Sequence, residues 1–290
     1  AAKGRNGLVL VHRRELITQA SRKLTDAGVA HGMIAAGMDG ANASIQVASV
    51  QTLIRRLQKI TTPPDLIIID EAHHAAAGSW QAIINHWPDV PLIGVTATPC
   101  RLDGKGLGNV FDTLIEGPSV QLLTSAGYLS PARIYAPPMV ADLSGIKRRA
   151  GDYAIDQAAD AMTRPTVTGD AIKHYRTLAG DQQAIAFCCS INHAVSVRDS
   201  FATTDISSEL LLGNTSDRDA VVGRFANGET RILVTVDVVS EGFDIPAAGC
   251  AILLRPTQSL GLYLQQVGRV LRPAPGKVHA IILDHVGNVT

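Results

Sequence analysis

The sequence predicts an α/β fold in which two domains are each built on a mainly parallel sheet. Short, β-rich apolar runs alternate with longer amphipathic stretches, and this alternation occurs twice along the chain. Most of the short runs are continuously apolar, which is typical of parallel strands that are covered on both faces. The length of 290 residues fits about two domains at roughly 150 residues each.

Eight apolar runs are expected to be strands. The four in the first half are Gly7 to Val11, Ile45 to Val47, Leu66 to Ile69 and Leu92 to Val95. The four in the second half are Ala184 to Cys188, Ile232 to Val236, Ala251 to Leu254 and Val278 to Leu283. Between the first two runs, Arg14 to Ala27 predicts an amphipathic helix that Gly28 ends.

The domain boundary is expected where prolines and glycines are densest. That stretch lies between Gly117 and Pro138. We therefore place the boundary near residue 130, which gives domains at residues 1–130 and 131–290.

Composition excludes several classes of protein. Lys plus Arg equals Asp plus Glu at 26 each, so any nucleic acid must bind in a local groove rather than to a polycationic chain. No apolar run reaches the roughly 18 residues that a membrane span needs. The four cysteines lack C-x-x-C spacing, so we expect neither a zinc site nor a disulfide framework, and a reduced, cytoplasmic location.

The run Leu66 to Ile69 continues directly into Asp70-Glu71-Ala72-His73. A buried parallel strand would deliver these polar side chains to its carboxyl end, where open α/β sheets bind ligands. Asp70 is then placed to hold Mg²⁺ through water, and Glu71 to orient and deprotonate an attacking water. The alternative is a polar strand end in which Asp70 caps a helix.

A second polar group follows the run Leu92 to Val95. The hydroxyls of Thr96 and Thr98 could relay a change at a nucleotide to the neighbouring domain, although an ordinary Ser/Thr turn fits the same residues.

The stretch Gln265 to Pro273 predicts the end of a helix that carries two arginines. Gln265, Arg269 and Arg272 recur at i, i+4 and i+7, which places them on one face. We expect the opposite, buried face to be apolar; its residues are Leu260, Leu264, Val267 and Leu271. Two guanidinium groups suit a triphosphate, whereas a solvated basic face is the alternative.

Three further segments carry candidate ligand contacts. Gly242 permits close backbone approach, and Asp244 could accept a ribose hydroxyl. Arg14 and Ser49 each stand where a strand turns into a helix, so helix-start amides there could bind the phosphates of a nucleic-acid backbone. Helix or loop capping explains each of these positions equally well.

In order and spacing, these motifs resemble those of superfamily 2 helicases of the DEAH type. The resemblance covers nearly the whole chain, from His12-Arg13-Arg14-Glu15-Leu16 to Arg272. Residues 94–107, Gly-Val-Thr-Ala-Thr-Pro-Cys-Arg-Leu-Asp-Gly-Lys-Gly-Leu, are most similar to the bacterial and phage RadD-like and restriction-subunit-like branch.

The resemblance implies two RecA-like domains with ATP and Mg²⁺ in the cleft between them and nucleic acid across both. It implies that His73 couples hydrolysis to the second domain, as do Thr96 and Thr98. It implies that Gln265, Arg269 and Arg272 reach the γ-phosphate. Gly242 and Asp244 would sense nucleotide and strand together. Four residues would lie on segments that grip the nucleic-acid backbone: Arg14, Ser49, Gln51 and Thr235.

One departure from the family pattern is large. The phosphate-binding loop G-x-x-x-x-G-K-[ST] is absent from these 290 residues, and Gly104-Lys105-Gly106 does not replace it. In family order that loop would precede Ala1, so we expect the chain to be a fragment that is truncated before it, with an incomplete first domain and impaired ATP hydrolysis.

The expected activity of the intact parent is that of an ATP-dependent helicase or translocase that acts on DNA rather than RNA, with DNA repair among its expected roles. Two alternatives stay open: a non-catalytic, helicase-like scaffold that binds nucleic acid, and the motor subunit of a restriction or repair nuclease, with any nuclease residing elsewhere.

Overall fold

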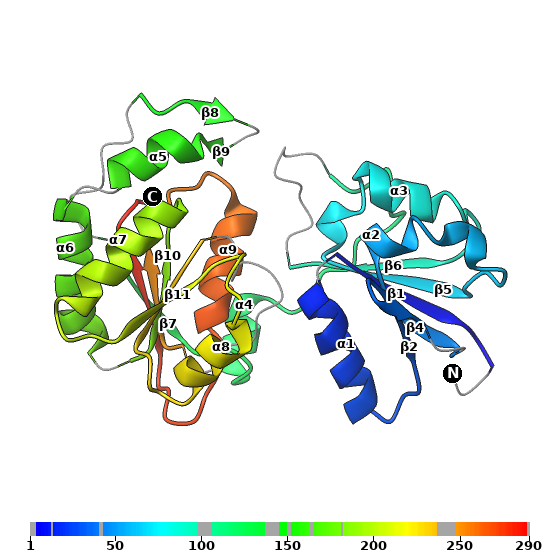
Figure 1. Cartoon of the computed structure of the whole chain (residues 1–290), viewed down its shortest axis with the longest axis horizontal. Helices are drawn as coiled ribbons and strands as arrows, with labels where there is room; N and C mark the ends of the chain where they lie inside the picture. Colours follow the sequence, from blue (N-terminus) through cyan, green and yellow to red (C-terminus); the bar gives the residue numbers. More distant parts are fainter. Residues whose placement is uncertain are drawn as a thin grey trace. The chain divides into compact units, whose positions relative to one another are not determined.

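The computed structural model describes residues 4–12, 14–40, 43–97, 106–136, 145–149, 152–162, 165–180, 182–236 and 248–288. The chain divides into two compact units, Ala1–Ile115 and Glu116–Thr290 (Figure 1). The division precedes the position near residue 130 at which prolines and glycines are densest. Residues just before 130 belong to the second unit because Ser130 N–H donates to Leu271 O at 2.7 Å.

The first unit contains a sheet of six strands among its described residues, in the order β3-β2-β4-β1-β5-β6. Neighbouring strands are parallel except β2 and β3. The strands are β1 (Gly7–Val11), β2 (Gly32–Ala35), β3 (Met38–Asp39), β4 (Ile45–Ser49), β5 (Leu66–Asp70) and β6 (Leu92–Val95). The four strands expected in this half are confirmed, and β2 and β3 are additional.

Helices cover the two faces of this sheet to different extents. Helix α1 (Arg14–Asp26) packs on one face against side chains from β1, β2 and β4. The other face is covered by α2 (Val50–Leu53), η1 (Leu57–Lys59), η2 (Ala72–His74) and α3 (Gly78–Ile84). The central strands are therefore buried between two layers, whereas the side of β6 that faces the α1 layer is not.

Strand β6 lies at an edge of the first sheet and pairs only with β5 among the described residues. Ile93 and Val95, two residues apart and so on the same face, are 50% and 56% exposed. On the opposite face Leu92 packs into the core with Phe111. The edge strand is thus covered on one face and bare on the other.

The second unit contains a parallel sheet of six strands among its described residues, in the order β11-β12-β10-β13-β14-β7. The strands are β7 (Ala132–Tyr135), β10 (Ala184–Phe187), β11 (Ser208–Leu211), β12 (Ile232–Thr235), β13 (Cys250–Leu253) and β14 (Ala280–Asp284). Every residue of β10, β12, β13 and β14 is buried, as expected for parallel strands covered on both faces.

The second unit also holds most of the helices that the structure describes. They are α4 (Val120–Ser125), α5 (Ile155–Met162), α6 (Pro165–His174), the π-helical turn η3 (Tyr175–Ala179), α7 (Ile191–Ala202), α8 (Arg218–Ala226) and α9 (Leu260–Val270). A small hairpin, β8 (Arg148–Arg149) with β9 (Asp152–Tyr153), completes the unit. Among the described residues, no helix has the length and apolarity to cross a membrane.

Candidate functional site

The carboxyl end of β5 carries a sharp backbone turn. Asp70 is the last residue of the strand, and Glu71 takes the left-handed conformation with φ of 52° before η2 begins at Ala72. This conformation is sterically unfavourable for any residue that has a Cβ atom. It is kept only where the surrounding structure enforces it, and such residues are common at functional sites. The turn places the Asp70 and Glu71 carboxylates next to each other at the edge of the sheet.

The Asp70 carboxylate is electrostatically unfavourable where it lies. Partial burial raises its pKa, and repulsion from Glu71 raises it further. The backbone N–H of Glu71, which donates to Asp70 Oδ1 at 3.0 Å, acts in the opposite direction, as do His12 and His73. Two neighbouring carboxylates with this repulsion are a suitable site for a divalent cation, which would relieve it.

His73 connects this turn to the segment that follows β6. Its Nδ1 is hydrogen-bonded to the Thr96 hydroxyl at 3.1 Å and lies 3.2 Å from Glu71 Oε2. Both the His73 and Glu71 side chains are largely buried. The structure therefore brings together four of the predicted residues: Asp70, Glu71, His73 and Thr96.

Two further histidines, for which no role is predicted, lie at this edge. The rings of His12, which follows β1, and His74 have centroids 4.8 Å apart, and those of His73 and His74 are 4.1 Å apart. Because β1 and β5 are parallel neighbours, their carboxyl ends meet, and His12 comes close to His74. This proximity depends on the order of the strands in the sheet, which the sequence pattern does not reveal.

The segment after β4 holds Ser49 and Gln51. The hydroxyl of Ser49 donates to Gln51 Oε1 at 2.7 Å and does not cap α2, although Ser49 is its N-cap residue. The alternative interpretation, in which the Ser49 side chain caps the helix, is therefore wrong. Arg14 is the first residue of α1, and its side chain lies outside the described set.

In the second unit, α9 carries Gln265 and Arg269 near its end. The helix ends at Val270, so Arg272 lies just beyond it. Arg269 is 9% exposed, whereas Gln265 and Arg272 are half-buried. The guanidinium of Arg269 is therefore held within the protein rather than on a solvated basic face.

The predicted apolar face of α9 is wrong in part. Leu260 and Leu264 are 68% and 39% exposed, whereas Val267 and Val270 are buried. Gln266, which the sequence analysis passes over, is 2% exposed, and its Oε1 has no hydrogen-bond partner among the described residues. Helical spacing fixes which residues share a face but does not reveal which face packs on the sheet.

Thr235 ends β12 and is fully buried. Its hydroxyl donates to Leu211 O at 2.9 Å, which joins the ends of β12 and β11. This contact supports a structural role at the strand ends. Three other predicted residues lie outside the described part of the chain: Thr98, Gly242 and Asp244.

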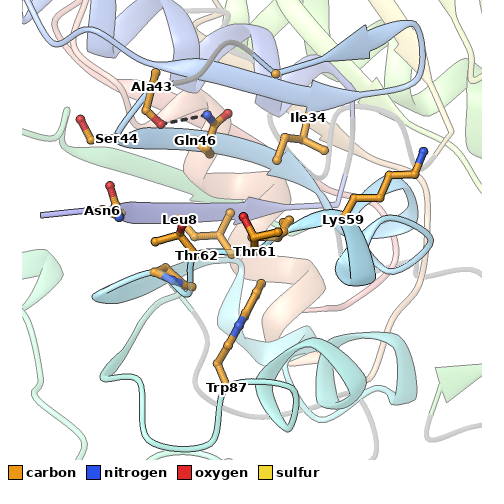
Figure 2. Close-up of a pocket in the computed structure, with 14 residues that line it drawn as sticks. Asn6, Leu8, Ile34, Ala43, Ser44, Gln46, Lys59, Thr61, Thr62 and Trp87 are labelled. Atoms are coloured by element: carbon orange, nitrogen blue, oxygen red, sulfur yellow. Dashed lines mark hydrogen bonds between the residues drawn. The ribbon is translucent and has the colours of Figure 1, made fainter.

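A cavity of about 430 Å³ lies in the first unit, away from the residues described above. It is lined by Asn6 and Ser44, which precede β1 and β4, and by Lys59, Thr61 and Trp87 among others (Figure 2). These residues lie at the amino ends of the strands, and Asp70 lies at the carboxyl end. Because the strands are parallel, the cavity and the carboxylates occupy opposite edges of the sheet.

The described residues contain no group of three or more His, Cys, Asp and Glu side chains that could hold a metal ion. A pair of carboxylates still fits Mg²⁺, since this ion keeps several waters and binds through one or two carboxylates together with phosphate oxygens. The oxygens of Asp70 and Glu71 are ligands of the type it prefers.

Two family descriptions match the chain. Residues 1–101 match "Type III restriction enzyme, res subunit", and residues 169–274 match "Helicase conserved C-terminal domain". The first match contains the Asp70 turn and Thr96. The second contains α9 with its glutamine and arginines.

Individual relatives agree with these matches. A 51.5 kDa protein of a Lactococcus phage is 36% identical over 99% of this chain and 60% of its own length. A Saccharomyces cerevisiae protein named as an ATP-dependent helicase, IRC3, is 33% identical over 97% of this chain and 43% of its own length. A fragment structure from Vibrio vulnificus, assigned as the HsdR subunit of a type I restriction enzyme, superposes with a TM-score of 0.74. It is 23% identical, and the match covers 99% of this chain and 54% of that one. The chain thus spans about two-fifths to three-fifths of the length of these proteins.

Proposed function

Because the chain belongs to the superfamily 2 helicases of the restriction-subunit-like type, we propose that it forms the motor core of an ATP-dependent helicase or translocase that acts on DNA. The observation that carries this proposal is the turn at Glu71, which sets two carboxylates beside His73 and Thr96 at the carboxyl edge of the first sheet. DNA is favoured over RNA because the first unit matches a restriction-enzyme subunit.

Within this proposal the residues of the first unit prepare the nucleotide for hydrolysis. Asp70 would hold Mg²⁺, and the Glu71 carboxylate orients a water molecule and accepts its proton. When bound, Mg²⁺ would neutralise charge on the phosphate oxygens. His73, which contacts both Glu71 and Thr96, transmits the state of the turn to the segment after β6.

The residues of the second unit stabilise charge on the phosphates. We propose that Arg269 and Arg272 reach the γ-phosphate, with Gln265 beside them, when the two units close on ATP. Such arginines contribute about 10³–10⁵ in rate in related nucleotide hydrolases. After hydrolysis the attraction is lost, the units separate and the grip on the strand shifts.

The bare side of β6 supports a further part of the proposal. Ile93 and Val95 are exposed on a strand that is paired on only one side among the described residues, and soluble proteins normally cover such edges. We propose that a strand and helix encoded upstream complete this side of the sheet. That upstream segment would carry the phosphate-binding loop that the 290 residues lack.

Finer assignments belong to the same proposal. We propose that Asp70-Glu71-Ala72-His73 is a DEAH-type motif and that the protein acts in restriction or DNA repair. The match of the first unit to a restriction-enzyme subunit supports the restriction role. The second candidate is a scaffold that binds nucleic acid without hydrolysing ATP.

The test uses the protein extended upstream until the phosphate-binding loop is included. We expect ATP hydrolysis that single-stranded DNA stimulates, and we expect Glu71→Gln to abolish it while DNA binding in a gel-shift or anisotropy assay stays intact. Glu116→Gln, at an exposed carboxylate, is the matched control and should hydrolyse ATP like the wild type. Normal turnover in the Glu71→Gln protein would overturn the assignment, and an extended protein that binds DNA without any hydrolysis would favour the scaffold.

A further inference from the structure

The carboxyl end of α9 is held by Lys277, which follows it closely in sequence, and by Ser130, which lies far from it in sequence. Lys277 Nζ donates to the carbonyls of Val270 at 2.6 Å and Arg272 at 2.8 Å, and also to Ala248 O at 2.7 Å. Ser130 donates its N–H to Leu271 O at 2.7 Å and its hydroxyl to Arg272 O at 3.5 Å. The last carbonyls of a helix have no partner within the helix, and here other segments supply partners for those at its end.

The ammonium group of Lys277 matches this set of acceptors. It has three N–H donors, and three backbone carbonyls surround it. A positive charge is also favourable at the carboxyl end of a helix, where the helix dipole is negative. The bond to Ala248 ties the end of α9 to the segment that leads into β13. Lys277 therefore fixes α9 relative to the central strands of the sheet.

The backbone that these hydrogen bonds hold, residues 270–272, lies next to or includes the two arginines. Arg269 directly precedes Val270, one of the residues whose carbonyl Lys277 holds, and Arg272 is itself held through its carbonyl. We infer that Lys277 is a positioning residue for Arg269 and Arg272, acting through the backbone at the end of α9. This inference rests on the proposed function, in which those two side chains contact the γ-phosphate.

The protonation state of Lys277 offers a specific readout. Burial lowers the pKa of Lys277 to about 8. Loss of the proton leaves an amine with two N–H donors facing three carbonyls, so one of them loses its partner. The end of α9 should therefore loosen as the pH rises through about 8. A lysine that merely filled space would produce no such transition.

The first experiment measures amide hydrogen exchange over residues 266–273 of the 290-residue chain from pH 6 to pH 9.5, corrected for intrinsic exchange. We expect wild-type protection to fall with a midpoint near pH 8. Below pH 8, Lys277→Met should lose about 10-fold or more of this protection, because a single unmet hydrogen bond typically costs that much, and the deficit should shrink above pH 8, where the wild type loosens as well. In Lys277→Arg, whose guanidinium stays charged, amide protection of these residues should stay high across the whole pH range. Lys173→Met, at an exposed lysine on α6, should behave like the wild type.

If Lys277→Met does not fold, the wild-type transition and its absence in Lys277→Arg still decide the question. A flat wild-type profile, or a transition that persists in Lys277→Arg, would overturn the inference.

The second experiment measures ATP hydrolysis in the upstream-extended protein. Displacing a catalytic group by about 1 Å can cost about 10²-fold in rate, so Lys277→Met should lower kcat by about that factor with a smaller effect on KM, and Lys277→Arg should recover most of it. An unchanged kcat in Lys277→Met would refute the positioning role. An extended wild-type protein without ATPase would refute the proposed function and leave the hydrogen-exchange transition in place.

Discussion

Nδ1 of His73 is hydrogen-bonded to the hydroxyl of Thr96 at 3.1 Å. The two residues follow β5 and β6, which are neighbouring parallel strands, so this bond joins the ends of two strands at the edge that carries the carboxylates. His73 also lies 3.2 Å from Glu71 Oε2. Any change at the Glu71 carboxylate can therefore reach the segment after β6 through one imidazole ring.

We predict that Thr96→Val separates hydrolysis from its response to DNA. The substitution keeps the shape of the side chain and removes the hydroxyl that bonds His73, a net loss of about 0.5–1.5 kcal/mol. In the upstream-extended protein, DNA-independent ATPase should be retained while stimulation by single-stranded DNA is largely lost. Thr96→Ser keeps the hydroxyl and should retain stimulation. Equal stimulation in Thr96→Val would show that the bond carries no signal.

We predict that Asp70→Asn stabilises the folded chain at neutral pH. Burial and the charge of Glu71 raise the pKa of Asp70 above its ordinary value of 3.8. The folded state therefore holds this proton more tightly than the unfolded state, and stability falls as the pH rises through the raised pKa. Thermal unfolding should show a higher Tm for Asp70→Asn at pH 7, with the difference vanishing below pH 3.8. A lower Tm for the variant at pH 7 would contradict this account.

We predict that backbone strain at Glu71 can be released by glycine. With φ of 52°, a residue that has a Cβ atom loses roughly 1–2 kcal/mol relative to glycine. Glu71→Gly should therefore have a free energy of unfolding about 1 kcal/mol greater than Glu71→Ala, the matched variant that also lacks the carboxylate. Urea unfolding measures this difference. At an ordinary helical position glycine is the less stable of the two, so equal stabilities or the reverse order would refute strain.

We predict that the 290-residue chain associates with itself through β6. Among the described residues this edge has no partner strand beyond β5. It carries Ile93 and Val95, both about half exposed, and such edges template intermolecular pairing. The double variant Ile93→Lys with Val95→Lys should be monomeric at concentrations where the wild type associates, as measured by analytical ultracentrifugation. Ile115→Lys, at an 88% exposed residue that follows the sheet, should leave association unchanged. Association that survives the double variant would place the contact elsewhere.

The strands were predictable where apolar side chains run without interruption. Gly7–Val11 has the same bounds in the structure as in the prediction, because a buried parallel strand needs apolar residues on both faces. Leu92–Val95 also keeps its predicted bounds, although one of its faces is exposed. The strand Ser208–Leu211 was not predicted, since it carries a serine and a charged glutamate. That glutamate is accommodated because Arg224 Nε donates to Glu209 Oε1 at 2.9 Å, a contact between segments that no local pattern reveals.

The candidate site was predictable in its residue types and only partly in its geometry. Strand ends placed Asp70, Glu71 and Thr96 at one edge, because the carboxyl ends of parallel strands meet. The contribution of His12 depends on β1 lying beside β5, which is a property of strand order. The packing of α9, with Gln266 buried and Leu264 exposed, depends on which face meets the sheet and is set by tertiary contacts.

Gly94 shows how closely the position of Thr96 depends on residues that come later in the chain. A methyl group on Gly94 would overlap the ring of Phe111 and lie 2.7 Å from Cβ of Ala72. An alanine at this position would therefore force either the phenyl ring or the strand to move, and a displaced strand would carry the threonine away from its imidazole partner. The absence of a side chain at Gly94 thus keeps the Thr96 hydroxyl within reach of its partner. In a library of substitutions at residue 94, only glycine should retain function unless both residue 72 and residue 111 are made smaller as well.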